Sequence, residues 1–333
     1  MPDILPSSLQ EILGRRGRIP FVEYCDLALY HPGDGYYRQS STRVGATREA
    51  DFQTNLAVKS LFAPLIIEAA RTLLDGEALA EYRFVEVAAE PESSLLSDLD
   101  SPFASSEVVR LGDPIPSLGG KVILFANEWL DAQPFARMIF EEGSWREAFV
   151  EIGSDGNLCE STGELTSGDA RSLMAALPEV APEGYRLDLS PRADAVLADY
   201  LASPWKGLFL TLDYGSSWEA LTHSLPAGTG RAYFRHQQEG NLLARPGKQD
   251  LTCNVCWDRV AAVLEEAGFS VGGPQRQEAF LLEKAADSIR EIVEGGASAE
   301  AGARRARLMQ LLNPVHFGAA FQVMWGRRGL AAS

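Results

Sequence analysis

Apolar and polar positions alternate along the chain in segments typical of an α/β fold. One segment, 121–126, is almost continuously apolar, as strands covered on both faces of a parallel sheet are. Three further apolar runs predict strands at 82–87, 107–111 and 208–212. Apolar residues recur at helical spacing at 55–74, 192–201 and 257–267. Strands that alternate with helices predict a doubly wound, Rossmann-like α/β sheet.

Two regions depart from this alternation. The first 75 residues have helical patterns at both ends, and Ser8 with Glu11 fits a capping box for a short helix. At 137–187, short apolar runs separated by turn residues predict an antiparallel β insertion near the functional edge of the sheet. We therefore expect an N-terminal helical or lid region at 1–75 and an α/β core at 76–333 that carries the insertion.

Charge and composition exclude several classes of partner. The 333 residues include 30 basic and 46 acidic side chains, a formal net charge of −16. Such a field repels phosphate backbones and anionic headgroups, whereas it attracts a basic protein. The N-terminus has no apolar stretch typical of a secretory signal, and no run approaches the roughly 20 residues that span a bilayer. Four cysteines do not make a disulfide scaffold, so a reducing cytoplasm is the simplest interpretation.

Common catalytic and cofactor motifs are absent. The chain has no G-x-G-x-x-G, no phosphate loop, no H-E-x-x-H and no G-x-S-x-G. Cys253 and Cys256 form the single C-x-x-C pair, which we interpret as thiols packed like small hydrophobic residues rather than as a zinc or redox site. Only four histidines are present, so a multi-histidine metal centre is not expected.

Seven stretches, taken in order from about residue 19 to 325, resemble the MidA-like group of class I S-adenosylmethionine (SAM)-dependent methyltransferases. This group is related to the mitochondrial arginine methyltransferase that helps assemble respiratory complex I. The stretches are Ile19-Pro20-Phe21 through His31-Pro32 and Gly35-Tyr36-Tyr37; Asp51-Phe52-Gln53-Thr54; Asn127-Glu128-Trp129-Leu130-Asp131-Ala132-Gln133-Pro134; Asp213-Tyr214-Gly215; Arg231-Ala232-Tyr233 with His236; Pro246-Gly247-Lys248-Gln249-Asp250-Leu251-Thr252; and Asn313-Pro314 with Phe317-Gly318. The resemblance implies a SAM-dependent methyltransferase acting on a protein side chain, with arginine as the expected residue.

The predicted catalytic residues follow the apolar strand at 121–126. Asn127 and Glu128 lie at its carboxyl end, where open α/β sheets bind ligands, and Asp131 shares that rim. An amide beside a carboxylate offers both donors and acceptors to a substrate nitrogen. The alternative is that Asn127 and Asp131 cap the following helix.

Four residues are expected at the substrate cleft. Asp213 and Tyr214 end another apolar strand on the same rim, although a simple strand-ending turn explains them equally well. The resemblance implies that His236 and Asp250, which flank a loop containing Gly and Pro, face the cleft. A lone histidine is more often structural, and this alternative stays open for His236.

The expected cofactor contacts come from separate segments. The resemblance places Asp51 and Thr54 near the cofactor, in a loop that closes over the site, although Thr54 also fits a helix cap. Glu86 and Ala88 lie in the first strand and its turn. Asp113 is the nearest candidate for the acid that holds the ribose hydroxyls.

The turn after the first strand departs from the family pattern V-E-L-G-P-G-x-G-T-L. Ala88, Glu90 and Glu92 replace the three glycines that let backbone approach a cofactor closely. Two carboxylates near the carboxylate of SAM repel it, by roughly 4 kcal/mol at about 4 Å and an effective dielectric near 20. The 40 positions from Val87 to Asn127 are also shorter than the usual span, so elements there are expected to be shortened or missing.

Two functions therefore remain open at the level of sequence. One is a SAM-dependent protein methyltransferase, with cofactor binding weakened by the altered turn. The other is a non-catalytic methyltransferase-fold protein, a pseudoenzyme that serves as a partner-binding or assembly factor. Both imply a protein partner and no nucleic acid or membrane insertion, and neither indicates an oligomeric state.

Overall fold

The computed structural model describes residues 5–38, 59–89, 94–97, 99–110, 113–235, 237–313 and 321–330. A six-stranded sheet has the order β15-β16-β9-β4-β2-β3. Its strands are β2 (Arg83–Val87), β3 (Ser105–Val109), β4 (Lys121–Asn127), β9 (Lys206–Asp213), β15 (Ser270–Arg276) and β16 (Gln322–Arg328). The first four are parallel, whereas β16 runs antiparallel to both β9 and β15. The predicted α/β class is confirmed.

Helices cover both faces of this sheet, because consecutive residues of its strands alternate between two hydrophobic clusters. On β2, Phe84 packs into one cluster and Val85 into the other. The first cluster is completed by α3 (Lys59–Leu73), α8 (Gln277–Lys284), α9 (Ala286–Glu294) and α10 (Ala299–Leu312). The second is completed by α5 (Pro191–Leu201) and α7 (Trp257–Glu266). Burial on both faces explains why the strands are apolar throughout.

The connection between β2 and β4 is short. Its described residues form β3 and turns but no helix, in agreement with the short span in the sequence. β3 is the edge strand and begins two residues earlier than the apolar pattern predicts. The carboxyl ends of β2, β4 and β9 therefore meet at one edge of the sheet, and the described residues between β2 and β4 place no helix over that edge.

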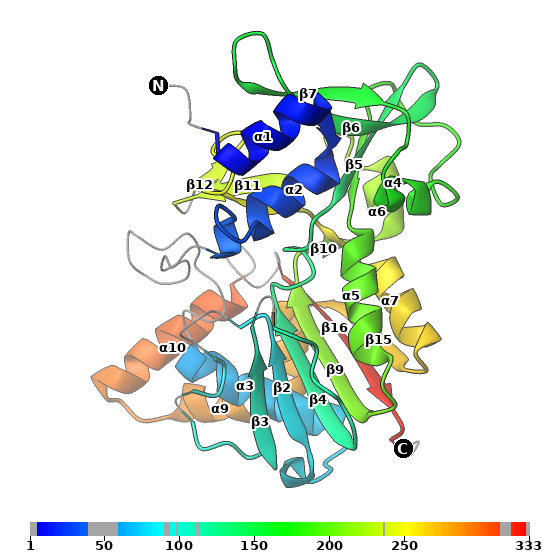
Figure 1. The fold of residues 1–333 in the computed structure, drawn as a ribbon. Helices are drawn as coiled ribbons and strands as arrows, with labels where there is room; N and C mark the ends of the chain where they lie inside the picture. Colours follow the sequence, from blue (N-terminus) through cyan, green and yellow to red (C-terminus); the bar gives the residue numbers. More distant parts are fainter. Residues whose placement is uncertain are drawn as a thin grey trace.

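A second layer consists of an antiparallel sheet between β4 and β9 in the chain. It contains β5 (Ala136–Glu141), β6 (Ser144–Ile152), β7 (Leu158–Gly163) and β8 (Arg186–Leu189), and β1 (Arg18–Pro20) joins it through β6. It lies above the parallel sheet in Figure 1, beside α1 and α2. Smaller elements complete this half: α4 (Gly168–Leu173), α6 (Trp218–His223), β10 (Gly215–Ser216), β11 (Arg231–Phe234), β12 (Gln237–Glu239), β13 (Asp250–Thr252) and β14 (Val255–Cys256).

The N-terminal segment contributes to both layers. α1 (Ser7–Arg16) and α2 (Phe21–Tyr30) pack with the antiparallel sheet, whereas α3 packs on the parallel sheet. The short 3₁₀ helices η1 (Tyr36–Arg38) and η3 (Leu79–Glu81) follow α2 and α3 respectively. The expectation that Ser8 caps α1 is wrong: Pro6 occupies the N-cap, and the Ser8 hydroxyl instead donates to Asp34 at 2.8 Å.

The four cysteines are free thiols. Cys253 and Cys256 are buried in two different hydrophobic clusters, which agrees with packing as small apolar residues. Within the described ranges, no group of three or more His, Cys, Asp or Glu side chains is arranged to hold a metal ion. None of the described helices combines the length and the apolar character needed to cross a membrane.

Candidate active site

The loop after β4 brings the first two predicted catalytic residues together. Asn127 is the last residue of β4, and its amide nitrogen donates to Glu128 Oε1 at 2.9 Å. Glu128 has φ +53°, a left-handed conformation that is costly for a non-glycine residue, and its N–H donates to Leu212 O at 2.9 Å. Residues 128–135 form turns rather than a helix, so the helix-capping alternative for Asn127 and Asp131 is wrong.

Asp213 fixes the position of this loop. Its Oδ2 accepts the N–H groups of Trp129, Leu130 and Asp131 at 3.2, 2.9 and 3.3 Å, and its Oδ1 accepts that of Tyr214 at 2.9 Å. The residue is completely buried at the end of β9. Because both oxygens bind backbone amides, Asp213 holds the strained turn beneath Glu128 in one conformation.

The carboxyl groups at this edge shift one another's pKa. Burial, and next the charge of Glu128, raise the pKa of Asp213 to about 7. Burial raises the pKa of Asp131 well above its usual range, with further contributions from Asp213 and Asp250. The side chains of Asp131 and Asp213 also interact with each other, and burial keeps the pKa of both above the usual range of an aspartate. Paired carboxyl groups with raised pKa values are typical of functional sites.

Tyrosines from the N-terminal segment form one wall of the site. The Tyr37 hydroxyl donates to Asp250 Oδ1 at 2.8 Å, and the Tyr30 hydroxyl donates to Ala132 O at 2.7 Å. The two rings stack with centroids 5.3 Å apart. Asp250 is only 3% exposed. Tyr30 and Tyr37 lie in stretches that the resemblance quotes, but no chemical pattern in the sequence marks them as site residues.

Arg231 supplies a positive charge beside these acids. Its guanidinium lies 5.1 Å from the centre of the Tyr214 ring, and its Nη2 donates to Asn254 Oδ1 at 2.8 Å. Its charge acts to lower the pKa of Asp131, yet the net effect on Asp131 is a strong rise. Asp131 thus interacts with Asp213 and Asp250 as well as with Arg231, and Glu128 lies beside Asp213. A site with this many carboxyl groups favours a cationic over an anionic ligand.

Ala88, the first residue after β2, has a backbone conformation typical of glycine. Ala88 has φ +59°, and its N–H donates to Val109 O on β3 at 2.8 Å. Glu86 is buried on β2, and its carboxylate accepts the N–H of Leu95 at 3.0 and 2.8 Å. Glu86 therefore holds Leu95, at the far end of the connecting loop, against β2.

Of the predicted cofactor and substrate residues not yet discussed, Asp113 lies in the described part of the chain. Asp113 lies beyond the carboxyl end of β3, where its Oδ2 accepts the N–H of Arg110 at 2.8 Å in an exposed turn. Asp51, Thr54 and His236 lie outside the described residues, and so do Glu90 and Glu92.

Comparisons with solved structures agree with this architecture. A Burkholderia thailandensis protein crystallised with S-adenosyl-homocysteine superposes with a TM-score of 0.83 over 98% of this chain and 92% of that chain, at 23% identity. A native structure of an uncharacterised protein of the same superfamily from that organism gives 0.78 with the same coverage and identity. At this identity, the likeness concerns the fold.

Sequence comparisons identify the family. Two curated relatives are the mitochondrial protein arginine methyltransferase NDUFAF7 homologues of Caenorhabditis elegans and Drosophila melanogaster, each 26% identical, over 56% and 49% of this chain. The matches span 44% and 37% of those relatives, less than half of their length. The family model described as "Putative S-adenosyl-L-methionine-dependent methyltransferase" matches residues 62–275. The chain belongs to this S-adenosyl-L-methionine-dependent methyltransferase family.

Proposed function

We propose that this protein binds SAM at the carboxyl edge of the parallel sheet and methylates an arginine side chain of a protein. The observation that carries the proposal is the buried, acidic site at the ends of β4 and β9, walled by tyrosines. Family membership supports SAM as the methyl donor, and the names of the two curated relatives support arginine as the acceptor.

The cofactor supplies a methyl group on a positively charged sulfur. The residues proposed to hold it are Ala88 in the turn, Glu86 through its anchoring of the loop, and Asp113 for the ribose hydroxyls. Asp51 and Thr54 are assigned to the same pocket from the resemblance alone. The left-handed conformation of Ala88 supports this assignment, because backbone at that point turns as a glycine loop does.

The chain's own residues would orient the acceptor. The Glu128 carboxylate, held by Asn127, hydrogen-bonds a guanidinium N–H and thereby directs the nitrogen at the methyl group. Tyr214, His236 and Asp250 are proposed to line the substrate cleft. Asp213 positions the loop, and the ionised carboxylates accept the proton that the guanidinium loses on methylation.

A methyl-transfer assay tests this proposal. The purified full chain is incubated with labelled SAM and an arginine-rich peptide, with a matched lysine-rich peptide for comparison. We expect label on arginine only, and a loss of about a hundredfold or more in Glu128→Gln. Glu11→Gln, which changes a 70% exposed side chain on α1, serves as the control. No label on the arginine peptide, or equal rates in Glu128→Gln and Glu11→Gln, would contradict the proposed mechanism.

The acidic charge of the chain supports a basic protein as the partner. Nothing in the described residues or in the comparisons favours the non-catalytic alternative. A cytoplasmic location stays a prediction, because the two curated relatives are described as mitochondrial.

A further inference from the structure

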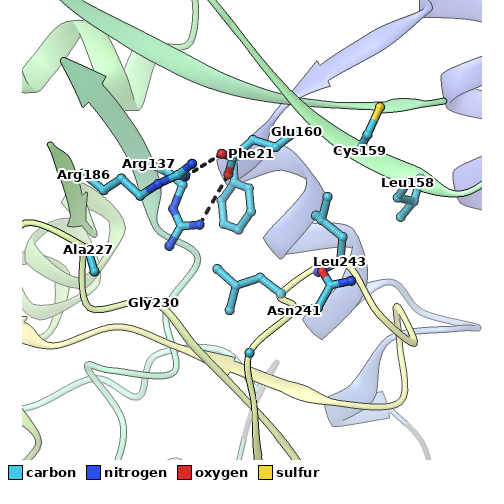
Figure 2. A pocket seen from close by; sticks show the side chains of 12 residues that line it. Phe21, Arg137, Leu158, Cys159, Glu160, Arg186, Ala227, Gly230, Asn241 and Leu243 are labelled. Atoms are coloured by element: carbon cyan, nitrogen blue, oxygen red, sulfur yellow. Dashed lines mark hydrogen bonds and ion pairs between the residues drawn. The ribbon is translucent and has the colours of Figure 1, made fainter. Parts of the chain in front are cut away.

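A cavity of about 470 Å³ lies within the antiparallel half of the molecule. It is bordered by β5, β7 and β8, by the start of α2 and by the loop at 240–243 (Figure 2). None of the side chains assigned to the proposed active site lines it. Its volume is within the range of sites that bind small organic molecules.

One wall of the cavity is ionic. Arg137 donates to both oxygens of Asp188, at 2.7 and 3.1 Å, and to Glu160 Oε2 at 3.3 Å. Arg186 donates from Nη1 to Glu160 Oε1 at 2.5 Å. Figure 2 shows the two guanidinium groups converging on Glu160. Each carboxylate oxygen of Asp188 and Glu160 therefore already binds a guanidinium group.

The donors of this wall are not all used. Within the part of the chain that the structure describes, Nε and Nη2 of Arg186 have no hydrogen-bond partner, and the Arg186 side chain is 35% exposed. Asn241 accepts the N–H of Leu243 through Oδ1 at 2.9 Å, while its Nδ2 has no partner in the same described part. Because side-chain acceptors are occupied and donors remain, the cavity is complementary to a hydrogen-bond acceptor.

Apolar side chains make up another part of the lining. They are Phe21, whose ring centre lies 5.2 Å from the Arg137 guanidinium, Leu158 and Leu242. The carbonyl oxygen of Leu242 accepts the Tyr24 hydroxyl at 3.1 Å and Gln249 Nε2 at 2.9 Å, which fixes the loop. Such a surface suits the aromatic or aliphatic body of a ligand.

The loop at 227–230 keeps the ionic wall rigid. The N–H groups of Thr229 and Gly230 donate to Asp188 Oδ2 at 2.8 and 2.7 Å. A Cβ at Gly228 would lie 2.4 Å from Asp188 Oδ2, and one at Gly230 would lie 2.6 Å from Arg137 Nη2. The backbone thus wraps closely around the Arg137–Asp188 pair, so the ionic wall is formed before any ligand enters.

We propose that this cavity is a binding site for a small organic carboxylate with an apolar body. Arg186 and Asn241 bind the carboxylate, and the wall of Phe21, Leu158 and Leu242 packs against the rest of the ligand. The formal charges of the ionic wall balance, with two guanidinium groups (Arg137 and Arg186) against two carboxylates (Asp188 and Glu160), and the N–H groups of Arg186 and Asn241 that have no partner among the described residues are left for the ligand. The net charge of the chain slows the approach of an anion, but charges farther than about 8 Å are largely screened at physiological ionic strength.

Three probes of matched size and different charge test the proposal. Indole-3-acetate, indole-3-acetamide and tryptamine are titrated by calorimetry into the full chain in the absence of SAM, with saturation-transfer NMR as a second readout. We expect indole-3-acetate to bind at least fivefold more tightly than either of the others. Binding equal to or weaker than that of tryptamine would overturn the proposal.

Two substitutions in the cavity test whether indole-3-acetate binds there. Arg186→Gln and Asn241→Asp are each expected to weaken indole-3-acetate at least fivefold, whereas Arg15→Gln, on the 70% exposed side chain of another arginine, is expected to have no effect. If Arg186→Gln fails to fold, Asn241→Asp decides, because Asp keeps the oxygen that accepts the N–H of Leu243. Unchanged affinity in Asn241→Asp would overturn the proposal. No step of this test depends on methyl transfer.

Discussion

The turn after β2 allows a direct comparison of two neighbouring alanines. Ala88 has φ +59°, whereas Ala89 is not among the residues with positive φ and is 6% exposed. A left-handed conformation costs a non-glycine residue roughly 1–2 kcal/mol. Replacement by glycine removes that cost at Ala88, but it also raises the entropy of the unfolded chain, worth about 0.4–1 kcal/mol. Ala88 is partly buried against the second hydrophobic cluster, so its methyl group contributes part of the roughly 0.8 kcal/mol of a fully buried one. We therefore expect Ala88→Gly to stabilise the protein by up to about 1 kcal/mol.

Ala89→Gly is the matched control, because the same atoms are removed one residue away. It has the same unfolded-state cost of about 0.4–1 kcal/mol and loses a buried methyl group worth about 0.8 kcal/mol. The two variants should therefore differ by about 2 kcal/mol in their free energy of unfolding. At roughly 2.1 cal/mol/K per residue, a chain of this length gives about 3 °C between their melting temperatures.

Urea unfolding followed by circular dichroism, with thermal melts in parallel, measures both variants. The informative quantity is the free energy of unfolding of Ala88→Gly minus that of Ala89→Gly, which we expect to be positive. The added entropy of the unfolded chain is the same in both variants and cancels in this difference. If both variants lose the same stability, then Ala88 bears no left-handed strain, and the argument that the turn retains a glycine-like shape is refuted.

Three further predictions concern the buried polar groups. Arg137→Met leaves the buried Asp188 without its guanidinium and should cost about 3–5 kcal/mol in urea unfolding. Gly230→Ala places a Cβ 2.6 Å from Arg137 Nη2 and should lower the melting temperature, whereas Gly240→Ala, which meets nothing within 4 Å, should not. The folded-state pKa of Asp213 is raised to about 7, above its ordinary value near 3.9, and the pKa of Asp131 is also raised, so the folded state retains protons that the unfolded state has lost. Wild-type stability should therefore fall from pH 5 to 7, by up to about 1.4 kcal/mol per pH unit for each of these two groups, and less steeply in Asp213→Asn, as unfolding at both pH values will show.

The parallel sheet was predictable because its strands are buried on both faces. Such burial selects apolar residues at every position, as in β4, and that signal does not depend on the rest of the chain. The start of α1 was not predictable in the same way. Ser8 has the sequence pattern of a cap, but its hydroxyl is bound by Asp34, which lies 26 residues away. Long-range partners of this kind leave no local pattern.

The candidate site likewise has parts that the sequence predicts and parts that it does not. The position of Asn127 and Glu128 followed from the end of an apolar strand, because parallel strands present their carboxyl ends at one edge. The alternative interpretation of Asn127 and Asp131 required a helix after Glu128, but Asp213 accepts three successive N–H groups there and holds a turn. The contact of Tyr37 with Asp250 joins residues more than 200 positions apart, so it appears only in the folded chain.

The left-handed backbone at Ala88 is also a property of the fold rather than of the residue. Alanine in place of glycine indicated a damaged cofactor turn, but the strand pairing around it, with its N–H bound to Val109, holds the glycine-like conformation. The sequence also predicts that Glu90 and Glu92 repel the carboxylate of SAM, and a binding measurement tests this.

Calorimetric titration of S-adenosyl-homocysteine into the full chain, purified free of cofactor, addresses that question most directly. We predict a saturable heat with one site per chain, and tighter binding in Ala88→Gly, where the backbone approaches the nucleoside without a methyl group in between. Absence of heat at millimolar nucleoside, in both the wild type and Ala88→Gly, would contradict the assignment of this edge as a cofactor site.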